Sequence, residues 1–91
     1  MLELQLSNQF KKDIKKLQKS GNNDFEEFNK VLKLLCQQII LPLKYKNHKL
    51  SGKYKEYFDC HIKDNWILIY KIDNNVLKLA RTGTHNDVLG I

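Results

Sequence analysis

The run WILIYKI, residues 66 to 72, most constrains what this chain can fold into. It is nearly continuous in apolar residues and rich in β-branched and aromatic side chains, which is typical of a central strand. Alternating segments lie on either side of it, at residues 56–63 and 76–81, and Asp73, Asn74 and Asn75 supply turn chemistry before the second of them. The C-terminal half therefore predicts a meander of three antiparallel strands.

The N-terminal half shows two different periods. Residues 2–6, LELQL, alternate as a short strand does, and apolar residues then recur at helical spacing over 8–19 and 25–39. Ser20 and Gly21 supply a stop for the first helix, and Asp24 with Glu27 resembles a capping box for the second. Two helices joined by a short link form an antiparallel hairpin.

These elements predict a single α+β domain over residues 1–91. Its expected order is strand, helix, helix and three strands. We expect an antiparallel sheet of about four strands with the helical hairpin packed on one face.

Charge points to a polyanionic partner. The net charge is +6, and residues 28–54 contain no acidic residue but six lysines: Lys30, Lys33, Lys44, Lys46, Lys49 and Lys53. A surface of one sign attracts polyanions, so the first candidate partner is nucleic acid and the second is an acidic protein. Any single lysine can instead be present only for solubility. The long basic connection at residues 42–55 is of the kind that often carries function.

The remaining composition indicates a cytosolic protein. Cys36 and Cys60 form no C-x-x-C and no metal-ligand pair, so we expect both to pack as reduced, apolar groups. No basic N-terminal region precedes an apolar run, and no apolar stretch approaches the roughly 20 residues that span a bilayer. We expect neither secretion nor membrane insertion.

Arg81 is the only arginine among sixteen basic residues. On a regular strand it shares a face with Leu77 and Leu79, so its guanidinium should emerge beside an apolar surface. One interpretation is a salt bridge across the sheet to Asp59 or Glu56. The other is phosphate binding, because a guanidinium makes forked contacts with phosphate and stabilises charge developing on phosphorus.

The three histidines, His48, His61 and His85, all lie in the C-terminal half. They are not paired at metal-site spacing, so we expect no metal and no cofactor. His85 follows Arg81 by four residues and could bring an imidazole to the same phosphate, where it can give or take a proton. An RNase needs a base, an acid and a cation, and this chain contains such a set.

A family resemblance rests on longer motifs. The run NHKLSGKYKEYFDCHIKDNWILIYKI, followed by RTGTH, resembles the YafQ branch of the RelE/ParE superfamily, the small toxins of bacterial toxin–antitoxin pairs. The resemblance covers nearly the whole chain and implies a RelE-like fold. It also implies a bacterial, cytoplasmic mRNA interferase, which enters the ribosomal A site and cuts mRNA by attack of the ribose 2′-hydroxyl.

The resemblance also implies roles for individual residues. His85 would donate a proton to the leaving group, and Arg81 would clamp the phosphate. His48 and His61 would serve in proton transfer or substrate positioning. Trp66 would support the site by packing or by contact with RNA, and a pure core role is an equal alternative.

Two positions depart from the family pattern. The family usually has Pro-Asp before the tryptophan, whereas this chain has Asp64-Asn65-Trp66. Either a turn lets Asp64 reach the site, or Asn65 takes its place and weakens general-base capacity. Near the C-terminus, Leu89 stands where the family tends to have an aromatic that stacks on a base, an interaction worth roughly 1 to 3 kcal/mol.

The expected partners are a cognate acidic antitoxin, the ribosome and mRNA, with the free toxin monomeric. Contacts with phosphate position a protein on RNA without reading the base sequence. The lysines of the basic connection are therefore candidates for contact with ribosomal RNA: Lys44, Lys46, Lys49 and Lys53. Two alternatives stay open: a gyrase poison of the ParE branch, and a basic nucleic-acid-binding module without catalysis.

Overall fold

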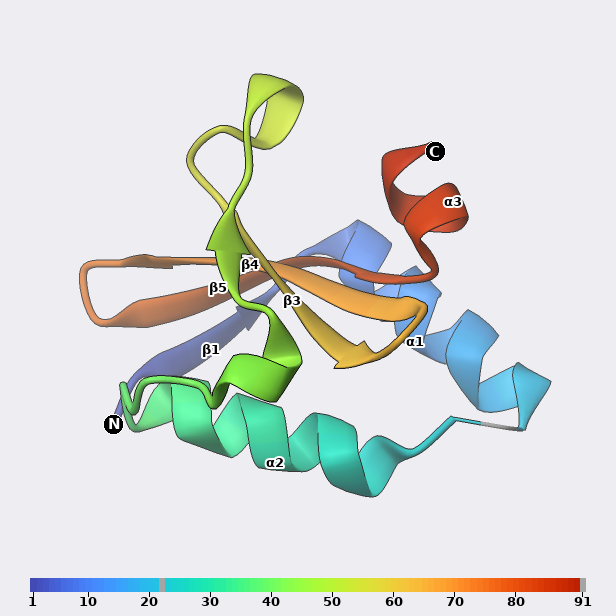
Figure 1. Cartoon of the computed structure of the whole chain (residues 1–91), viewed down its shortest axis with the longest axis horizontal. Coiled ribbons are helices and arrows are strands. Elements are labelled where there is room, and N and C mark those ends of the chain that lie inside the picture. Colours follow the sequence, from blue (N-terminus) through green and yellow to red (C-terminus); the bar gives the residue numbers. More distant parts are fainter. Residues whose placement is uncertain (22, 91) are drawn as a thin grey trace.

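A computed structural model describes residues 1–21 and 23–90, so residues 22 and 91 of the predicted domain lie outside the described residues. Figure 1 shows a curved sheet with helices below and beside it. The elements are β1 (Glu3–Leu6), α1 (Asn8–Ser20), α2 (Phe25–Cys36), η1 (Leu43–Tyr45), β2 (His48–Lys49), η2 (Gly52–Tyr54), β3 (Phe58–Lys63), β4 (Trp66–Asp73), β5 (Val76–Gly83) and α3 (His85–Leu89).

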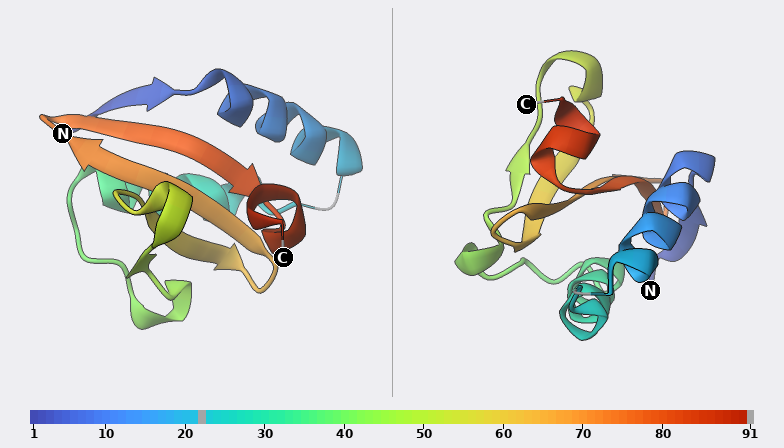
Figure 2. Two further views of the ribbon diagram at one scale, coloured as in Figure 1. Left: turned by 90° about the horizontal axis from the view of Figure 1, so that it is seen from above. Right: turned by 90° about the vertical axis from the view of Figure 1, so that its right-hand side faces the viewer.

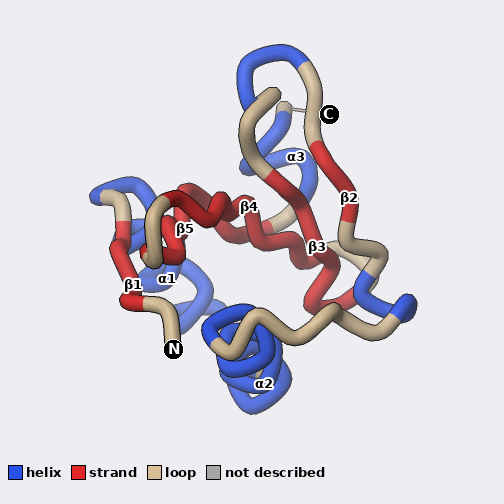
Figure 3. Tube along the Cα trace, turned by 90° about the vertical axis from the view of Figure 1, so that its left-hand side faces the viewer, coloured by secondary structure: helices blue, strands red, loops and turns tan. Residues whose placement is uncertain are grey.

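The sheet has five strands in the order β1-β5-β4-β3-β2. The predicted meander is confirmed, because β3, β4 and β5 pair antiparallel. The prediction of a four-stranded antiparallel sheet is wrong in two respects: β1 pairs parallel with β5, and β2 adds a strand at the other edge (Figure 3). No hairpin joins β1 to β5, so the connection between them does not impose an antiparallel direction.

The helix ends follow the predicted signals. Ser7 caps α1 by accepting the N–H of Phe10, and Gly21 ends that helix in the left-handed conformation at φ 76°. Asp24 caps α2 by accepting the N–H of Glu27 at 3.0 Å. The second helix ends at Cys36, three residues before its predicted limit.

One core fills the space between the sheet and both helices. Phe10 of α1 stacks on Phe28 of α2, with ring centroids 6.2 Å apart. The helix α1 lies along β5, whereas α2 lies under β3 (Figure 2). The buried members of this core are Leu2, Phe10, Phe28, Val31, Leu35, Leu41, Tyr45, Cys60, Ile62, Trp66, Leu68, Tyr70, Leu77 and Leu79.

A smaller apolar cluster covers the opposite face of the sheet. Its buried members are Ile67 and Ile69 of β4 and Val88 of α3. Figure 1 shows α3 and η2 on this side of the sheet, away from α2. The central strand is thus covered on both faces, which explains why its sequence is a continuous apolar run rather than an alternating one.

Both cysteines are free thiols. Burial raises the pKa of Cys60 to about 12, so this thiol stays protonated at neutral pH. In the described part of the chain, no helix has the length and apolar composition needed to cross a membrane.

Candidate active site

A row of paired residues crosses the face that carries α3. His48 of β2 pairs with Asp59 of β3, Asp59 pairs with Ile69 of β4, and Ile69 pairs with Arg81 of β5. Side chains of directly paired residues point to the same face of a sheet. The fold therefore places a histidine, a carboxylate and the arginine on one surface, although they are spread over 34 residues of sequence.

A β-bulge brings Arg81 to this face. The register of β4 and β5 shifts between Ile69 and Tyr70, so Tyr70 pairs with Leu79 and Ile69 pairs with Arg81. Ala80 is the extra residue, and Arg81 no longer shares a face with Leu79 as strict alternation predicts. The predicted face of Arg81 is therefore wrong, because alternation holds only where the ladder is regular.

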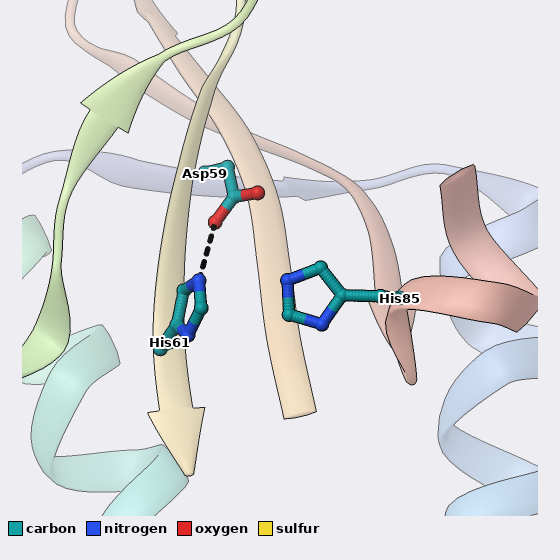
Figure 4. A group of neighbouring side chains, drawn as sticks. All are labelled: Asp59, His61 and His85. Atoms are coloured by element: carbon teal, nitrogen blue, oxygen red, sulfur yellow. Dashed lines mark ion pairs between the residues drawn. The ribbon is translucent and has the colours of Figure 1, made fainter. Parts of the chain in front are cut away.

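Asp59 is the centre of the histidine cluster. Its side chain is 2% exposed, and its two oxygens lie 3.9 Å from His48 Nε2 and 3.8 Å from His61 Nε2. Figure 4 shows His61 beside Asp59 on β3 and the ring of His85 approaching both from α3. The rings of His61 and His85 meet edge to face, with centroids 4.9 Å apart.

Burial governs the protonation of this cluster. The pKa of Asp59 is raised, first because the carboxyl is desolvated, while the neighbouring histidines oppose the shift. The pKa of His61 is lowered, again chiefly by burial, although the charge of Asp59 pulls it upward. His61 is therefore mainly neutral at pH 7, with a ring nitrogen that can accept a proton.

Asp59→Asn should stabilise the fold at neutral pH. The folded protein holds a proton on this carboxyl more tightly than the unfolded chain, so stability falls as the pH rises from the ordinary pKa of 3.8 through the raised one. Removing the charge removes this cost, so the Tm of the variant should rise at neutral pH. Thermal unfolding at pH 7 measures the gain.

The same unfolding experiment at pH 3 provides the control. There the carboxyl is protonated in both states, so the gain should shrink. A lower Tm for the asparagine variant at pH 7 would show instead that the ionised carboxylate stabilises the folded protein.

The segment RTGTH is built to place His85 over the sheet. Thr82 Oγ1 donates to the carbonyl of Ile67 at 2.8 Å, which ties the end of β5 to β4. A Cβ on Gly83 would lie 3.2 Å from Val88, so glycine permits the close return of the chain. Thr84 then caps α3 by accepting the N–H of Asp87, and His85 is the first residue of that helix.

Asn65, rather than Asp64, contacts His85. Both residues lie in the exposed turn between β3 and β4, and Asn65 Oδ1 is 3.3 Å from Nδ1 and 3.4 Å from the backbone N–H of His85. Among the described residues, no hydrogen bond or ion pair joins Asp64 to a histidine. Asn65 is thus the residue of this turn that contacts His85, and the catalytic role of Asp64 stays a prediction.

Arg81 is engaged by a residue that the sequence did not indicate. Its Nε donates to Asp13 Oδ2 at 2.8 Å and its Nη2 donates to Asp13 Oδ1 at 3.2 Å. The suggested salt bridge to Asp59 or Glu56 is wrong, because the carboxylate paired with Arg81 in the described structure is that of Asp13 on α1, which lies along β5.

Trp66 and Leu89 are packing residues in this structure. Trp66 is 5% exposed, stacks on Phe28 at 5.4 Å and donates from Nε1 to Thr82 Oγ1 at 2.8 Å. This is the core role that the sequence left open, and it offers no ring face to a base. Leu89 is half-buried against the cluster of Ile67, Ile69 and Val88.

The lysines of the basic connection lie on the surface. Lys44, Lys46, Lys49 and Lys53 are all exposed, and Lys44 Nζ is 3.5 Å from Glu27. A cavity of about 430 Å³ lies between this connection and the strand β3. Its walls include Lys44, Lys46, His61 and Asn65, so the cavity joins the cationic surface to the histidine cluster.

Three residues could also hold a metal ion. Asp59, His61 and His85 each offer one ligand atom, and these atoms lie within 4.8 Å of one another. Sequence spacing did not indicate this set, because the ligands come from β3 and from α3. Two imidazoles and one carboxylate suit a divalent transition metal such as zinc or copper.

Asp59 is the main site residue missed from the sequence. The alternation of β3 places it on the same face as His61, so part of the signal was present. What sequence could not supply is its burial and its pairing with His48, which depends on the two-residue strand β2. One of its oxygens, Oδ1, is buried without a hydrogen-bond partner in the described structure.

Fold and site together define a small basic α+β protein with groups for acid–base chemistry beside an arginine. The family model described as the bacterial toxin of a type II toxin–antitoxin system, YafQ, matches residues 2–90. The mRNA interferase toxin YafQ of Escherichia coli K12 is 38% identical over 89 residues, which span 97% of this chain and 96% of the relative. The chain therefore belongs to the YafQ family of type II toxins.

Solved structures agree with this assignment. The E. coli DinJ-YafQ complex contains a chain that is 37% identical, with a TM-score of 0.88 over 99% of this chain and 100% of that one. A copper-bound mutant toxin from Helicobacter pylori is 35% identical, with a TM-score of 0.92 over 97% and 99% of the two chains.

Proposed function

We propose that this toxin is a ribosome-dependent mRNA interferase that cleaves mRNA in the A site by attack of a ribose 2′-hydroxyl. The single observation that supports this most strongly is the cluster of Asp59, His61 and His85 on the face of the sheet that also carries Arg81. The relatives from E. coli are named mRNA interferases, and their identity extends over nearly the full chain.

The proposed chemistry needs two proton transfers. The 2′-oxygen forms a bond to the adjacent phosphorus while the bond from phosphorus to the 5′-oxygen breaks, which leaves a 2′,3′-cyclic phosphate and a 5′-hydroxyl. His61 accepts the proton of the 2′-hydroxyl, since burial lowers the pKa of this histidine and keeps it mainly neutral. His85 donates a proton to the departing 5′-oxygen.

The other groups of the row support these transfers. Asp59 lies 3.8 Å from His61 and stabilises the imidazolium that forms when His61 takes the proton. Arg81 neutralises the non-bridging phosphate oxygens, and it lies in the same row, two strands or about 10 Å from Asp59 at the backbone. His48, whose side chain is 53% exposed, contacts the substrate from the open side of the cluster.

Asn65→Asp should extend cleavage to higher pH. A carboxylate at the position of Asn65 Oδ1, 3.3 Å from His85 Nδ1, favours the protonated ring that the leaving group needs. The alkaline limb of the pH–rate profile should therefore move to higher pH. Single-turnover cleavage on programmed ribosomes between pH 6 and 9 measures the shift.

Asp64→Asn is the matched control for that profile. Asp64 is the adjacent residue in the same exposed turn, and we place it outside the proton transfer. A profile that moves with Asp64→Asn but not with Asn65→Asp would assign the carboxylate role to Asp64.

The proposed function is tested by adding the purified protein to a reconstituted translation reaction and mapping mRNA ends by primer extension. We expect cuts within A-site codons and none in the same mRNA without ribosomes. Cuts in free RNA would show that cleavage does not depend on the ribosome. Intact mRNA together with inhibited gyrase supercoiling would favour the ParE-like alternative.

The proposed partner is an acidic antitoxin. A relative from E. coli forms the DinJ-YafQ complex, and the net charge of +6 here favours a partner of opposite sign. We expect affinity to fall about tenfold or more between 50 and 500 mM salt, because salt screens such contacts. Titration calorimetry measures this, and a salt-independent affinity would indicate a mainly apolar interface.

A further inference from the structure

Asp13 is a buried carboxylate that the proposed chemistry does not use. It lies on α1, is 8% exposed and is one of three buried polar or charged residues in the described part of the chain. Burying a carboxylate is costly unless hydrogen bonds compensate. Asp13 accepts four hydrogen bonds: one from Gln9 Nε2 on the same helix at 3.2 Å, and three from one short segment of β5, namely Nε and Nη2 of Arg81 and the backbone N–H of Thr82.

That segment is where β5 loses its outer neighbour. The parallel pairing with β1 ends at Leu79, so beyond that residue no strand within residues 1–21 and 23–90 pairs with this edge of β5. Side chains of α1 and of its N-cap residue bond to the backbone of β5 there instead. Ser7 Oγ donates to the carbonyl of Ala80 at 2.7 Å, and Asp13 accepts the N–H of Thr82 at 3.1 Å. These bonds flank Arg81 at the bulge that turns its side chain to the active face.

The contact leaves part of the guanidinium available. A guanidinium has five N–H donors, and Asp13 engages two of them, one on Nε and one on Nη2. The other donors lie on Nη1 and on the far side of Nη2 and form a fork suited to phosphate. Tyr54 is the other side chain that interacts with this guanidinium, and the pKa of Arg81 is raised chiefly by Asp13 and further by Tyr54. A cavity of about 400 Å³, lined by Arg81, Asp13 and Thr84 among others, gives access to this group.

We propose that Asp13 is a positioning residue for RNA cleavage, which holds Arg81 in the orientation that presents its remaining donors to the scissile phosphate. The inference rests on the proposed function, since the orientation matters only if Arg81 binds that phosphate. Asp13 acts through Arg81 and does not touch the substrate. A misplaced group near a reacting centre costs up to about 100-fold in rate.

The first test observes the guanidinium itself and needs no activity. Because Arg81 is the only arginine, its Nε–Hε pair gives the only arginine signal of that kind in a ¹⁵N-labelled sample. We expect this proton to exchange slowly with water in the wild type and much faster in Asp13→Asn. Equal exchange in both proteins would overturn the inference.

Lys16→Ala is the matched control on the same helix. Lys16 forms an exposed ion pair with Asp87 at 3.0 Å and does not contact Arg81 through any described hydrogen bond. The exchange rate of the arginine signal should stay at the wild-type value in this variant. A change as large as that in Asp13→Asn would show that any disturbance of α1 loosens Arg81.

The second test is a double-mutant cycle on cleavage. We expect Asp13→Asn to lower kcat by about 10- to 100-fold with little change in KM, and to have no further effect in an Arg81→Ala background. Equal losses in both backgrounds would show that Asp13 supports the fold in general. Antitoxin binding by each variant shows that it is folded.

These readouts separate the two proposals. If the wild type does not cleave mRNA, the proposed function fails while the exchange measurement still decides whether Asp13 holds Arg81. If the wild type cleaves mRNA and Arg81→Ala is equally active, Arg81 does not bind the scissile phosphate during cleavage. Asp13 then has no positioning role in catalysis.

Discussion

His85→Ala lowers the single-turnover rate of mRNA cleavage by about 10²- to 10⁴-fold, the usual contribution of a positioned general acid. The expectation follows from the placement of the ring at the start of α3, against His61 and within 3.3 Å of Asn65 Oδ1. No other histidine approaches from that side within the described structure. The rate should be measured on ribosomes programmed with a defined A-site codon.

The next residue of α3 supplies a control for this variant. Asn86 is exposed, and Asn86→Ala should leave the rate near the wild-type value while changing the same helix. Imidazole added to the His85→Ala reaction should restore part of the activity, because it can enter the vacated space and donate a proton. A His85→Ala protein that cleaves at the wild-type rate would remove His85 from the chemistry.

Arg81→Ala should lower the rate by about 10²- to 10³-fold, as the loss of one preorganised donor to a developing charge does. Arg81→Lys should recover only part of this, because an ammonium keeps the charge but lacks the fork. The alanine variant also leaves Asp13 buried without its cation, so its Tm should fall as well. Rates must therefore be compared at a temperature where both variants are folded.

Lys78→Ala is the matched control for the arginine variants. Lys78 lies on the same strand and pairs with Asp73 at 3.3 Å, away from the row that contains Arg81. Its removal should leave the cleavage rate unchanged. An Arg81→Ala protein that retains full activity while Lys78→Ala does not would move the phosphate contact to the other end of β5.

The order and type of the main elements could be predicted because each has its own hydrophobic period. The continuous run at β4 indicated a central strand, and it is central because α2 covers one face and α3 the other. The parallel pairing of β1 with β5 could not be predicted from hydrophobic periodicity, since it joins segments about 70 residues apart in the sequence. The strand β2 has only two residues, too few to show any period.

The site was predicted as a set of residues but not as an arrangement. Motif resemblance named His48, His61, Arg81 and His85 without showing what holds them together. Asp59 lies between His48 and His61 in a buried position, Asp13 holds Arg81, and both contacts depend on the folded chain. The face of Arg81 was misjudged because one extra residue, Ala80, reverses the alternation of β5.

The most direct test of the account uses an mRNA with a single 2′-deoxynucleotide in the A-site codon. On programmed ribosomes, the all-ribose mRNA should be cut there and yield a 2′,3′-cyclic phosphate, because the 2′-oxygen is the nucleophile activated by His61. The same mRNA with the 2′-hydroxyl removed at the cleaved position should stay intact at that bond. Cleavage of the deoxy-substituted bond at an unchanged rate would contradict the account, since water or another nucleophile would then be attacking the phosphorus.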